Sequence, residues 1–330
     1  MSEELILLIL SLLLSFVLTI VFRKIAIRKS IMDIPNERSS HSIPTPRGGG
    51  MAIVITWYAA LAYLFVNQMI SDKLFYALLP GILLVIIGLL DDIFSISPIV
   101  RLLFQFAASV GALFFLEGFQ KIDLGFYTIE STWILTPFAV FAFVWMINLY
   151  NFIDGIDGYA ASEAVFIAII AFGFIGDIHL LVLALVCIGF LVLNWQKARI
   201  FMGDAGSTLL GYTFVVFAIF YQNENDVPAV FWLILSSLFW FDATLTLLRR
   251  FRNKEKLSQA HKKHAYQRIT QAGWSHQKTV IMAMLFNIVV CGSMASMTIY
   301  YPEYSLAALL ITVFCLYVMV RFIDRKKSFS

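Results

Sequence analysis

Charged residues are scarce in this chain of 330 residues, at 14% against the roughly 25% that is typical of soluble domains. Hydrophobic residues make up 60% of the chain, and the mean hydropathy is +0.84. A chain with so little charge cannot cover the surface of an ordinary soluble domain with polar groups. The composition therefore predicts a polytopic membrane protein.

Cysteine is rare as well. Cys187, Cys291 and Cys315 fall in apolar runs and lack the spacing of a metal site or a disulfide framework. We interpret them as small buried hydrophobic residues, and their number carries little information about the redox compartment. Nothing in the sequence predicts nucleic-acid binding.

A cleavable secretory signal is also absent. The apolar run 5–22 follows Glu3 and Glu4 and precedes Arg23 and Lys24, whereas a signal peptide carries its positive charge first. This order predicts a retained helix with its N-terminus outside.

Long apolar runs are abundant. Crossing a hydrocarbon core of about 30 Å takes about 20 apolar residues, and eleven stretches approach this length. The predicted spans are 5–22, 51–70, 74–90, 101–118, 132–148, 159–176, 179–194, 207–222, 229–247, 280–299 and 304–321.

The basic residues predict the orientation. With the N-terminus outside, eleven spans place the C-terminus in the cytoplasm, and only Lys73 and Lys121 among the 24 Lys and Arg residues lie on the outer side. This asymmetry agrees with the positive-inside rule. The largest inner loop is 248–279, and no internal repeat is visible. We expect an all-α fold, with residues 1–330 forming a single integral membrane domain.

Six aspartates lie at or near the inner ends of predicted spans, where an ionisable group by default indicates function. Asp91 and Asp92 end the apolar run 74–90, and adjacent carboxylates at a helix C-terminus repel each other and the helix dipole. A metal ion or basic side chains must therefore compensate them. The six are Asp91, Asp92, Asp154, Asp157, Asp204 and Asp242.

The stretch NLYNFIDGIDGYA holds Asn151, Asp154 and Asp157 at a spacing of three, which places them on one face if the segment is helical. Gly155 and Gly158 permit a turn or the close approach of a ligand. Carboxylate and amide oxygens suit Mg²⁺ or Mn²⁺. The alternative is an Asx-rich turn between two spans.

The stretch FMGDAGSTLLG precedes an apolar helix that Ser207 or Thr208 can cap, with free amides that form an anion site. The Asp204 carboxylate would repel a bare phosphate, which implies a bridging metal ion. The alternative is an ordinary capped start of a helix.

Two inner segments supply basic groups. His261, Lys262, Lys263 and His264 form the sequence HKKH, and the two histidines would share a face on a helix. Because the histidines lie among basic residues and lack cysteine partners, contact with an anion is favoured over a zinc site. The alternative is an ordinary inner loop, since such loops are usually basic.

The other basic segment is SSHSIPTPRGGG, in which Arg47 precedes three glycines. Its prolines and glycines exclude a regular helix and favour a flexible phosphate clamp. Contact between a basic inner loop and anionic lipid headgroups is the alternative. Acidic metal ligands, an anion site and basic side chains on one membrane face favour phosphoryl transfer between a soluble and a lipid-borne substrate.

The chain resembles the polyprenyl-phosphate N-acetylhexosamine-1-phosphate transferases, which include the phospho-N-acetylmuramoyl-pentapeptide translocases. The resemblance implies ten or eleven membrane helices around a cytoplasmic-side cleft in the bacterial inner membrane. It implies transfer of a sugar-1-phosphate from a UDP-sugar to undecaprenyl phosphate, with release of UMP. It rests on six motifs in the family's order, SSHSIPTPRGGG, LLDDIFSISPIVRLLFQ, NLYNFIDGIDGYA, FMGDAGSTLLG, FDATLTLLRR and HKKHAYQR.

The resemblance assigns roles to the acidic motifs. It makes Asp91 and Asp92 the pair near the lipid phosphate, with Asp91 as the base that deprotonates it. Asp204 becomes the principal ligand of Mg²⁺, for which Mn²⁺ can substitute. Asp154 and Asp157 become catalytic, with Asp157 as a second metal ligand.

The resemblance also assigns roles to the other polar motifs. Asn151 would line the nucleotide cleft, while His261 and His264 would contact the diphosphate with Lys262 and Lys263 nearby. Thr45 and Arg47 match the motif of the first inner loop. Assembly as a homodimer is left open.

One departure from the family bears on the sugar. The muramoyl-pentapeptide branch has three consecutive histidines where this chain reads HKKH, which disfavours a peptidoglycan precursor. HKKHAYQR is similar to enzymes that begin O-antigen or other surface-polysaccharide synthesis. N-acetylglucosamine, N-acetylfucosamine and N-acetylquinovosamine all remain open.

Two rival functions share single features with this sequence. A CDP-alcohol phosphatidyltransferase would share the DGIDGYAA pattern, but its arginine is missing at Ala161. An ion-coupled transporter would carry acids near mid-membrane together with internal repeats, and the sequence has neither.

Overall fold

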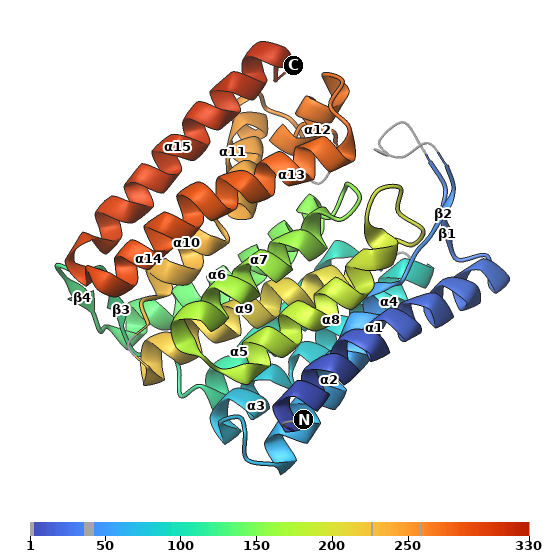
Figure 1. Ribbon diagram of the computed structural model, residues 1–330. Coiled ribbons are helices and arrows are strands. Elements are labelled where there is room, and N and C mark those ends of the chain that lie inside the picture. The colour runs from blue at the N-terminus through green and yellow to red at the C-terminus, as the bar shows by residue number, and fades with distance from the viewer. Residues whose placement is uncertain are drawn as a thin grey trace.

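The computed structural model describes residues 3–35, 43–94, 96–225, 227–257, 259 and 261–329, and it is a bundle of helices that run mostly along one direction (Figure 1). The helices are α1 (Glu3–Arg28), α2 (Gly50–Val66), α3 (Asp72–Leu78), α4 (Gly81–Phe94), α5 (Pro98–Phe115), α6 (Thr132–Ile153), α7 (Tyr159–Ile175), α8 (Ile178–Asn194), α9 (Asp204–Glu224), α10 (Ala229–Leu235), α11 (Ser237–Arg252), α12 (Ala265–Gln271), α13 (His276–Phe286), the π-helix η1 (Asn287–Gly292), α14 (Ser293–Tyr300), the 3₁₀ helix η2 (Pro302–Tyr304) and α15 (Ser305–Lys326).

Two short antiparallel hairpins depart from the all-α expectation. β1 (Met32–Asp33) pairs with β2 (Thr45–Pro46), and β3 (Ile122–Asp123) pairs with β4 (Thr128–Ile129). Each strand has only two residues, so the hairpins tie loops together at the ends of the bundle and leave the helical architecture unchanged.

Each of the eleven apolar stretches falls on a helix or a helix pair, and the chain is a multi-pass membrane protein. Seven helical segments are apolar and at least 18 residues long, and α10 and α11 form an eighth that is bent by 74°. The apolar helices α2, α7 and α8 are shorter, at 17 residues each. Length and composition therefore support seven or eight spans, and the count of eleven remains a prediction.

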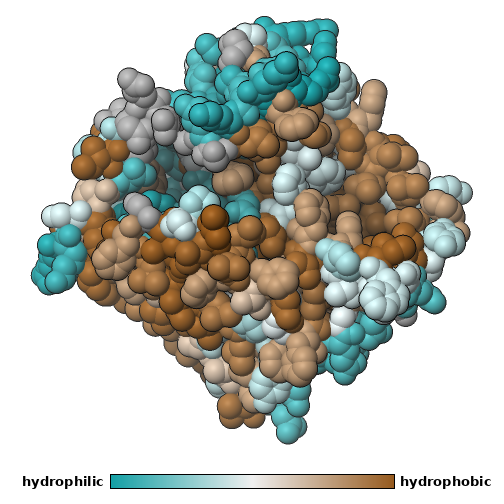
Figure 2. All heavy atoms as spheres, turned by 180° about the vertical axis from the view of Figure 1, so that it is seen from behind, coloured by the Kyte–Doolittle hydropathy of each residue, from teal (hydrophilic) through white to brown (hydrophobic). Residues whose placement is uncertain are grey.

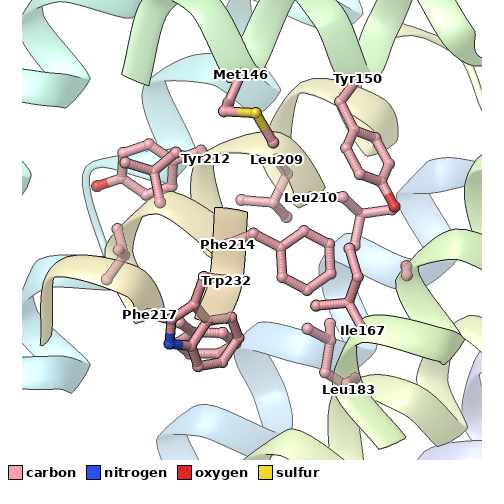
Figure 3. Close-up of a cluster of buried hydrophobic side chains, with 14 of the residues drawn as sticks. Met146, Tyr150, Ile167, Leu183, Leu209, Leu210, Tyr212, Phe214, Phe217 and Trp232 are labelled. Carbon is pink, nitrogen blue, oxygen red and sulfur yellow. The ribbon is translucent and has the colours of Figure 1, made fainter. Parts of the chain in front are cut away.

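Helix α9 is the centre of the bundle. Its most apolar window is 94% buried, whereas the six other long segments are 22–44% buried, because α9 is enclosed by other helices and they face the lipid. Figure 3 shows Phe214 and Phe217 of α9 beside Trp232 of α10, with Ile167 of α7 and Leu183 of α8 nearby. Asp204 is the first residue of this enclosed helix and is itself buried, so the fold places its carboxylate inside the bundle.

Glycines bring the polar motifs together. A Cβ atom on Gly50 of α2 would lie 2.6 Å from the Cα of Gly206 in α9, and one on Gly88 of α4 would lie 2.6 Å from the amide nitrogen of Ala205. Only glycine permits backbones to approach so closely. These contacts place the starts of α2 and α9 and the end of α4 at one point.

The predicted inner and outer segments separate onto the two ends of the bundle. At one end, Nζ of Lys73 is 3.0 Å from Glu117 and 2.7 Å from Glu224, which joins three predicted outer segments. The N-terminus lies near that end in Figure 1, and the C-terminus lies near the other. The identity of the end that faces the cytoplasm remains a prediction.

Candidate functional site

Two arginines neutralise the acidic motifs. Arg47 Nε lies 2.9 Å from Asp92 Oδ1, and Arg47 Nη2 lies 2.5 Å from Asp204 Oδ1. Arg101 of α5 lies 2.7 Å from Asp91 Oδ2 and 3.6 Å from Asp204 Oδ2. The positive compensation that the paired aspartates require is therefore supplied here by two basic side chains from two different segments.

The aspartate pair at the end of α4 has one free oxygen. Asp91 Oδ1 accepts the amide hydrogen of Ile96 at 2.6 Å, and Asp92 Oδ1 lies 3.5 Å from the first amide nitrogen of α9. Asp92 Oδ2 is buried and has no hydrogen-bond partner among the described residues. Gly203 faces it with φ +79°, and a Cβ there would lie only 2.7 Å from this oxygen. The arrangement keeps a small space beside the carboxylate.

The expected single helical face of Asn151, Asp154 and Asp157 is wrong. Helix α6 ends at Ile153, so Asn151 lies on its last turn while Asp154 follows it with φ −73° and ψ 53°. Gly158 adopts φ +74° and directly precedes α7. The glycines that permitted a turn do form one, and it points Asn151 and Asp157 into different cavities.

Asp154 lies in this turn near the acidic cluster. Burial raises the pKa of its carboxyl well above the ordinary value; Arg47 opposes this effect, and Asp204 and Asp92 add to it. The positive charge of Arg47 therefore acts on Asp154 as well as on Asp92 and Asp204.

The first cavity has a volume of about 490 Å³ and lies between α4, α5, α6, α9 and the loop before α12. Figure 2 shows a recess with hydrophilic residues near the hydrophilic end of the molecule, above a broad hydrophobic surface. The polar lining consists of Arg101, Gln105, Asn148, Asn151, Asp204, Thr208, Gln259, His261, His264 and Gln267, and the apolar lining includes Leu84, Ile87, Leu102, Phe152, Leu247 and Leu257.

An amide pair forms one wall of the first cavity. Gln105 Nε2 donates to Asn148 Oδ1 at 3.2 Å, and Asn148 Nδ2 donates to Gln105 Oε1 at 2.8 Å. The pair links α5 to α6 and presents neutral polar groups about one helical turn from Arg101 and Asn151.

The histidines of the HKKH segment lie together although the segment is not helical there. Their ring centroids are 4.8 Å apart. His261 Nδ1 accepts the amide hydrogen of Lys263 at 3.2 Å, which leaves the proton on Nε2. Burial, followed by the neighbouring His264 and Arg250, lowers the pKa of His261 to about 4. His261 is therefore a neutral hydrogen-bond donor at pH 7.

Asp242 of α11 anchors the segment. Its carboxylate accepts the amide hydrogens of Ala265 at 2.7 Å and Tyr266 at 3.3 Å, and it lies 3.7 Å from His264 Nδ1. Tyr266 in turn donates to the carbonyl of Phe152 at 3.2 Å. One buried aspartate thus fixes the start of α12 and the position of His264 against the turn after α6.

Much of the basic loop is structural. The side chain of Arg250 is 2% exposed and donates to Glu255 and to the carbonyls of Lys256, Leu257 and Gln259. Lys263 Nζ pairs with the same Glu255 at 2.9 Å. Lys262 accepts a hydrogen bond from Gln271 through its carbonyl. Lys263 is therefore held by a loop carboxylate, away from the aspartate cluster.

A second cavity of about 580 Å³ contains Thr45 and Asp157. Asp157 Oδ2 accepts the amide hydrogen of Ala198 at 3.2 Å and lies 3.4 Å from His276 Nδ1. The basic residues Arg23, Lys197 and Arg199 also line this cavity. Asp157 lines this second cavity, whereas Asp204 lines the first.

Two details of the glycine motifs differ from expectation. Ser207 and Thr208 lie within the first turn of α9 and donate back to Gly203 and Asp204 carbonyls, so neither caps the helix. The amides of Gly49 and Gly50 donate to the carbonyls of 201 and 202 at 2.9 and 2.8 Å. These two amides hold the two motifs together and are not free for phosphate. Residues 39–42 of the first motif, with His41, lie outside the described residues.

The donor set is compatible with Mg²⁺. Among the described residues, no three Asp, Glu, His or Cys side chains form a ready metal cage. Mg²⁺ in phosphoryl-transfer sites takes one or two carboxylates together with substrate phosphates and water, so a cage is not required. Asp204 and the unpartnered oxygen of Asp92 supply hard oxygen donors, and both carboxylates contact the same side chain, Arg47.

Comparison with known proteins places the chain in a family. A family model described as glycosyl transferase family 4 matches residues 74–222. A probable undecaprenyl-phosphate N-acetylglucosaminyl 1-phosphate transferase of Bacillus subtilis is 31% identical, over 85% of this chain and 81% of that protein. The chain belongs to the polyprenyl-phosphate N-acetylhexosamine-1-phosphate transferases. It is a transferase enzyme of the membrane.

Two further relatives of the transferase cover most of its length. An undecaprenyl-phosphate alpha-N-acetylglucosaminyl 1-phosphate transferase of Yersinia pestis is 29% identical over 96% of this chain and 90% of that protein. A decaprenyl-phosphate N-acetylglucosaminephosphotransferase of Mycobacterium leprae is 29% identical over 87% of this chain and 81% of that protein.

Sequence reasoning missed several residues of the candidate site. Arg101 was assigned no role, although a lone arginine at the inner end of an apolar run is itself a signal. Gln105 and Asn148 also line the first cavity and were not singled out. Their pairing across two helices carries no local sequence signature. His276, which lies beside Asp157, was likewise unassigned.

Proposed function

We propose that the transferase moves a sugar-1-phosphate from a UDP-N-acetylhexosamine to undecaprenyl phosphate, giving undecaprenyl-diphospho-sugar and UMP. The observation that carries this proposal is the convergence of Asp91, Asp92 and Asp204 with Arg47 and Arg101 at the edge of a cavity that has both polar and apolar lining residues. Such a cavity suits a lipid that ends in a phosphate.

The first cavity is the proposed acceptor site. Its apolar lining from α4, α5 and α11 suits the first isoprene units of the lipid, and Arg101 suits the phosphate. The Arg101 side chain is 36% exposed, so a phosphate can reach its guanidinium without breaking the ion pair with Asp91. The acceptor phosphate would then lie beside both aspartates of α4.

The second cavity is the proposed nucleotide site. Arg23, Lys197 and Arg199 provide positive charge, while Thr45 and Asp157 provide hydrogen-bonding groups for ribose or base. Arg47 follows β2 directly and reaches Asp92 and Asp204, so the β1–β2 hairpin connects the two cavities. A diphosphate that extends from the second cavity toward Asp204 would meet the acceptor phosphate there.

The chemistry is a displacement at phosphorus. An oxygen of the lipid phosphate attacks the β-phosphorus of the UDP-sugar, and the bond from that phosphorus to the bridging oxygen breaks, so that UMP leaves. Asp91 is the proposed base for the lipid phosphate. Bound Mg²⁺, held by Asp204, would neutralise charge on the diphosphate and on the leaving UMP. Asp157 remains a proposed second ligand, with Mn²⁺ as a substitute ion.

The histidines would contact the transferred group. His261 carries its proton on Nε2 and lines the first cavity beside His264. It can therefore donate a hydrogen bond to a phosphate oxygen as a neutral side chain, without the cost of burying a positive charge beside Arg250. Lys262 and Lys263 would add positive field from the loop.

Names of relatives guide the choice of sugar. N-acetylglucosamine is named for the three relatives described above and is the first sugar to test. We propose that the reaction starts lipopolysaccharide O-antigen or another surface polysaccharide, at the cytoplasmic face of the bacterial inner membrane. A homodimer is retained as a hypothesis.

The test is UMP release by purified protein with undecaprenyl phosphate, Mg²⁺ and a panel of UDP-sugars. Release of UMP that requires both the lipid and one UDP-N-acetylhexosamine supports the proposal. Release of CMP from a CDP-lipid would indicate the phosphatidyltransferase alternative. Ion-dependent uptake into vesicles without UMP release would indicate a transporter.

A further inference from the structure

A hollow of about 430 Å³ lies at the C-terminal end of the bundle, apart from both substrate cavities. Its lining comes from the ends of α11 and α15 and from the tail that follows α15 (Figure 1). The lining residues are Arg249, Arg252, Asn253, Arg321, Asp324, Ser328 and Phe329. Three arginines face one carboxylate, so the hollow is strongly positive.

The single carboxylate of the hollow is already neutralised. Asp324 accepts hydrogen bonds from both Nη atoms of Arg249 at 3.0 and 2.9 Å. It also accepts one from Nη1 of Arg268 at 2.6 Å. Asp324 therefore cannot offset Arg252 and Arg321, which are exposed. The hollow keeps about two unbalanced positive charges next to a small polar space, which favours an anion.

Apolar side chains lie directly below the two exposed arginines. Leu248 precedes Arg252 by four residues on the same face of α11 and is 56% exposed. On α15, Tyr317 and Val318 precede Arg321 by four and three residues and are 44% and 51% exposed. Both helices end at the same end of the bundle, so these side chains lie about one helical turn further from that end than the arginines.

We propose that this hollow binds the headgroup phosphate of an anionic phospholipid, with its acyl chains on the exposed apolar faces of α11 and α15. Positive charge at the headgroup level and apolar surface one turn below it match the two parts of one lipid molecule. Basic pockets between membrane helices recognise anionic headgroups in this way. A soluble phosphate would use the arginines alone and leave the apolar surface without a role.

The hollow also contacts the HKKH segment. The Phe329 ring lies 5.2 to 5.6 Å from the cationic groups of Arg249, Lys263 and Arg268. Arg268 Nε donates to the carbonyl of Lys263 at 3.1 Å. A lipid that fills the hollow is therefore in contact with the scaffold that positions His261 and His264.

The experiment measures lipid retention by the whole protein with native mass spectrometry after exchange into mixed phosphatidylglycerol and phosphatidylcholine. The test variant is Arg252→Gln/Arg321→Gln. The matched control is Lys254→Gln/Arg325→Gln, which removes two exposed charges from the same end outside the lining. Each arginine near an anionic surface contributes roughly fivefold, so the test variant loses on the order of tenfold or more in preference for phosphatidylglycerol.

The result that overturns the proposal is an unchanged lipid preference in the test variant, or an equal loss in test and control variants. Inorganic phosphate distinguishes the source of the anion, since displacement of the lipid at millimolar phosphate would show a site for soluble anions. Lipid retention needs no catalysis, so a failed transferase assay leaves this test intact. Equal melting temperatures of the two double variants confirm that both are folded.

Discussion

At the scale of single residues, the site is organised by charge compensation. Adjacent carboxylates at the end of α4 would be unstable alone, and Arg47 and Arg101 hold them in place from two other segments. The sequence predicted that a metal ion or basic side chains compensate this pair, because two carboxylates at a helix C-terminus are unfavourable. It did not reveal that Arg101 is one partner, since the contact spans a turn whose geometry no local pattern fixes.

Arg101 and Lys197 test the assignment of the two cavities. Arg101→Gln should raise the KM for undecaprenyl phosphate by about 10- to 100-fold, because a charge-assisted contact contributes roughly 1.5–3 kcal/mol. Lys197→Gln should instead raise the KM for the UDP-sugar. Steady-state kinetics with each substrate varied in turn measures both values. An Arg101 variant that affects only the UDP-sugar would place the acceptor elsewhere.

Asp154 predicts a dependence of stability on pH. Burial raises the pKa of its carboxyl in the folded protein above the value in the unfolded chain. The folded state therefore binds this proton more tightly, so the stabilisation is present at low pH and is lost as pH rises through the folded pKa. Asp154→Asn should be more stable than wild type at pH 8, and the difference should shrink as pH falls toward 4.

Thermal unfolding in detergent over this pH range measures the difference between the two proteins. Activity should fall in the same variant if Asp154 is catalytic. A constant difference in melting temperature from pH 4 to 8 would show that Asp154 is not the group that titrates.

At the scale of elements, helix positions follow from apolar runs, whereas the relative placement of polar side chains depends on where a helix stops. A spacing of three predicted one face for Asn151, Asp154 and Asp157, but α6 ends at Ile153. Glycine permits the turn between α6 and α7, because Gly158 adopts a positive φ that other residues rarely adopt. The result is a division of one motif between two cavities.

Gly155 tests how α12 packs against that turn. A Cβ on Gly155 would lie 2.1 Å from the hydroxyl oxygen of Tyr266, so Gly155→Ala must displace this ring. We expect a loss of about 1–3 kcal/mol in stability. Turnover should also fall, because the Tyr266 ring stacks on the ring of His264 with centroids 5.7 Å apart. Tyr266→Phe removes the clashing atom, so Gly155→Ala/Tyr266→Phe should recover most of the stability. Failure of this double variant to recover would show that the backbone, and not the clash, requires glycine.

At the scale of the whole molecule, composition predicts a multi-pass helical bundle because a chain with so few charges must face lipid. The gathering of the motifs at one end also follows, since six separate segments were predicted on the same side. The short hairpins and the bend between α10 and α11 do not follow, because strands of two residues and a break of one residue between helices leave no pattern in the sequence.

The predicted orientation has its own test. Lys121→Cys and Lys254→Cys, each in a background without the three native cysteines, lie at opposite ends of the bundle. A thiol reagent that cannot cross membranes should label Lys121→Cys in intact cells and Lys254→Cys only after lysis. The reverse pattern would place the aspartate cluster outside the cytoplasm.

The central claim is that the Asp204 end of the bundle transfers a sugar together with one phosphate to the lipid. The most direct measurement uses UDP-N-acetylglucosamine labelled at the β-phosphate, with purified protein and undecaprenyl phosphate. Label should enter the lipid phase in equal amount to UMP released, and folded Asp204→Asn should transfer almost none at any Mg²⁺ concentration. Label that stays in the aqueous phase for every UDP-sugar tested, or full activity of Asp204→Asn at low Mg²⁺, would contradict it.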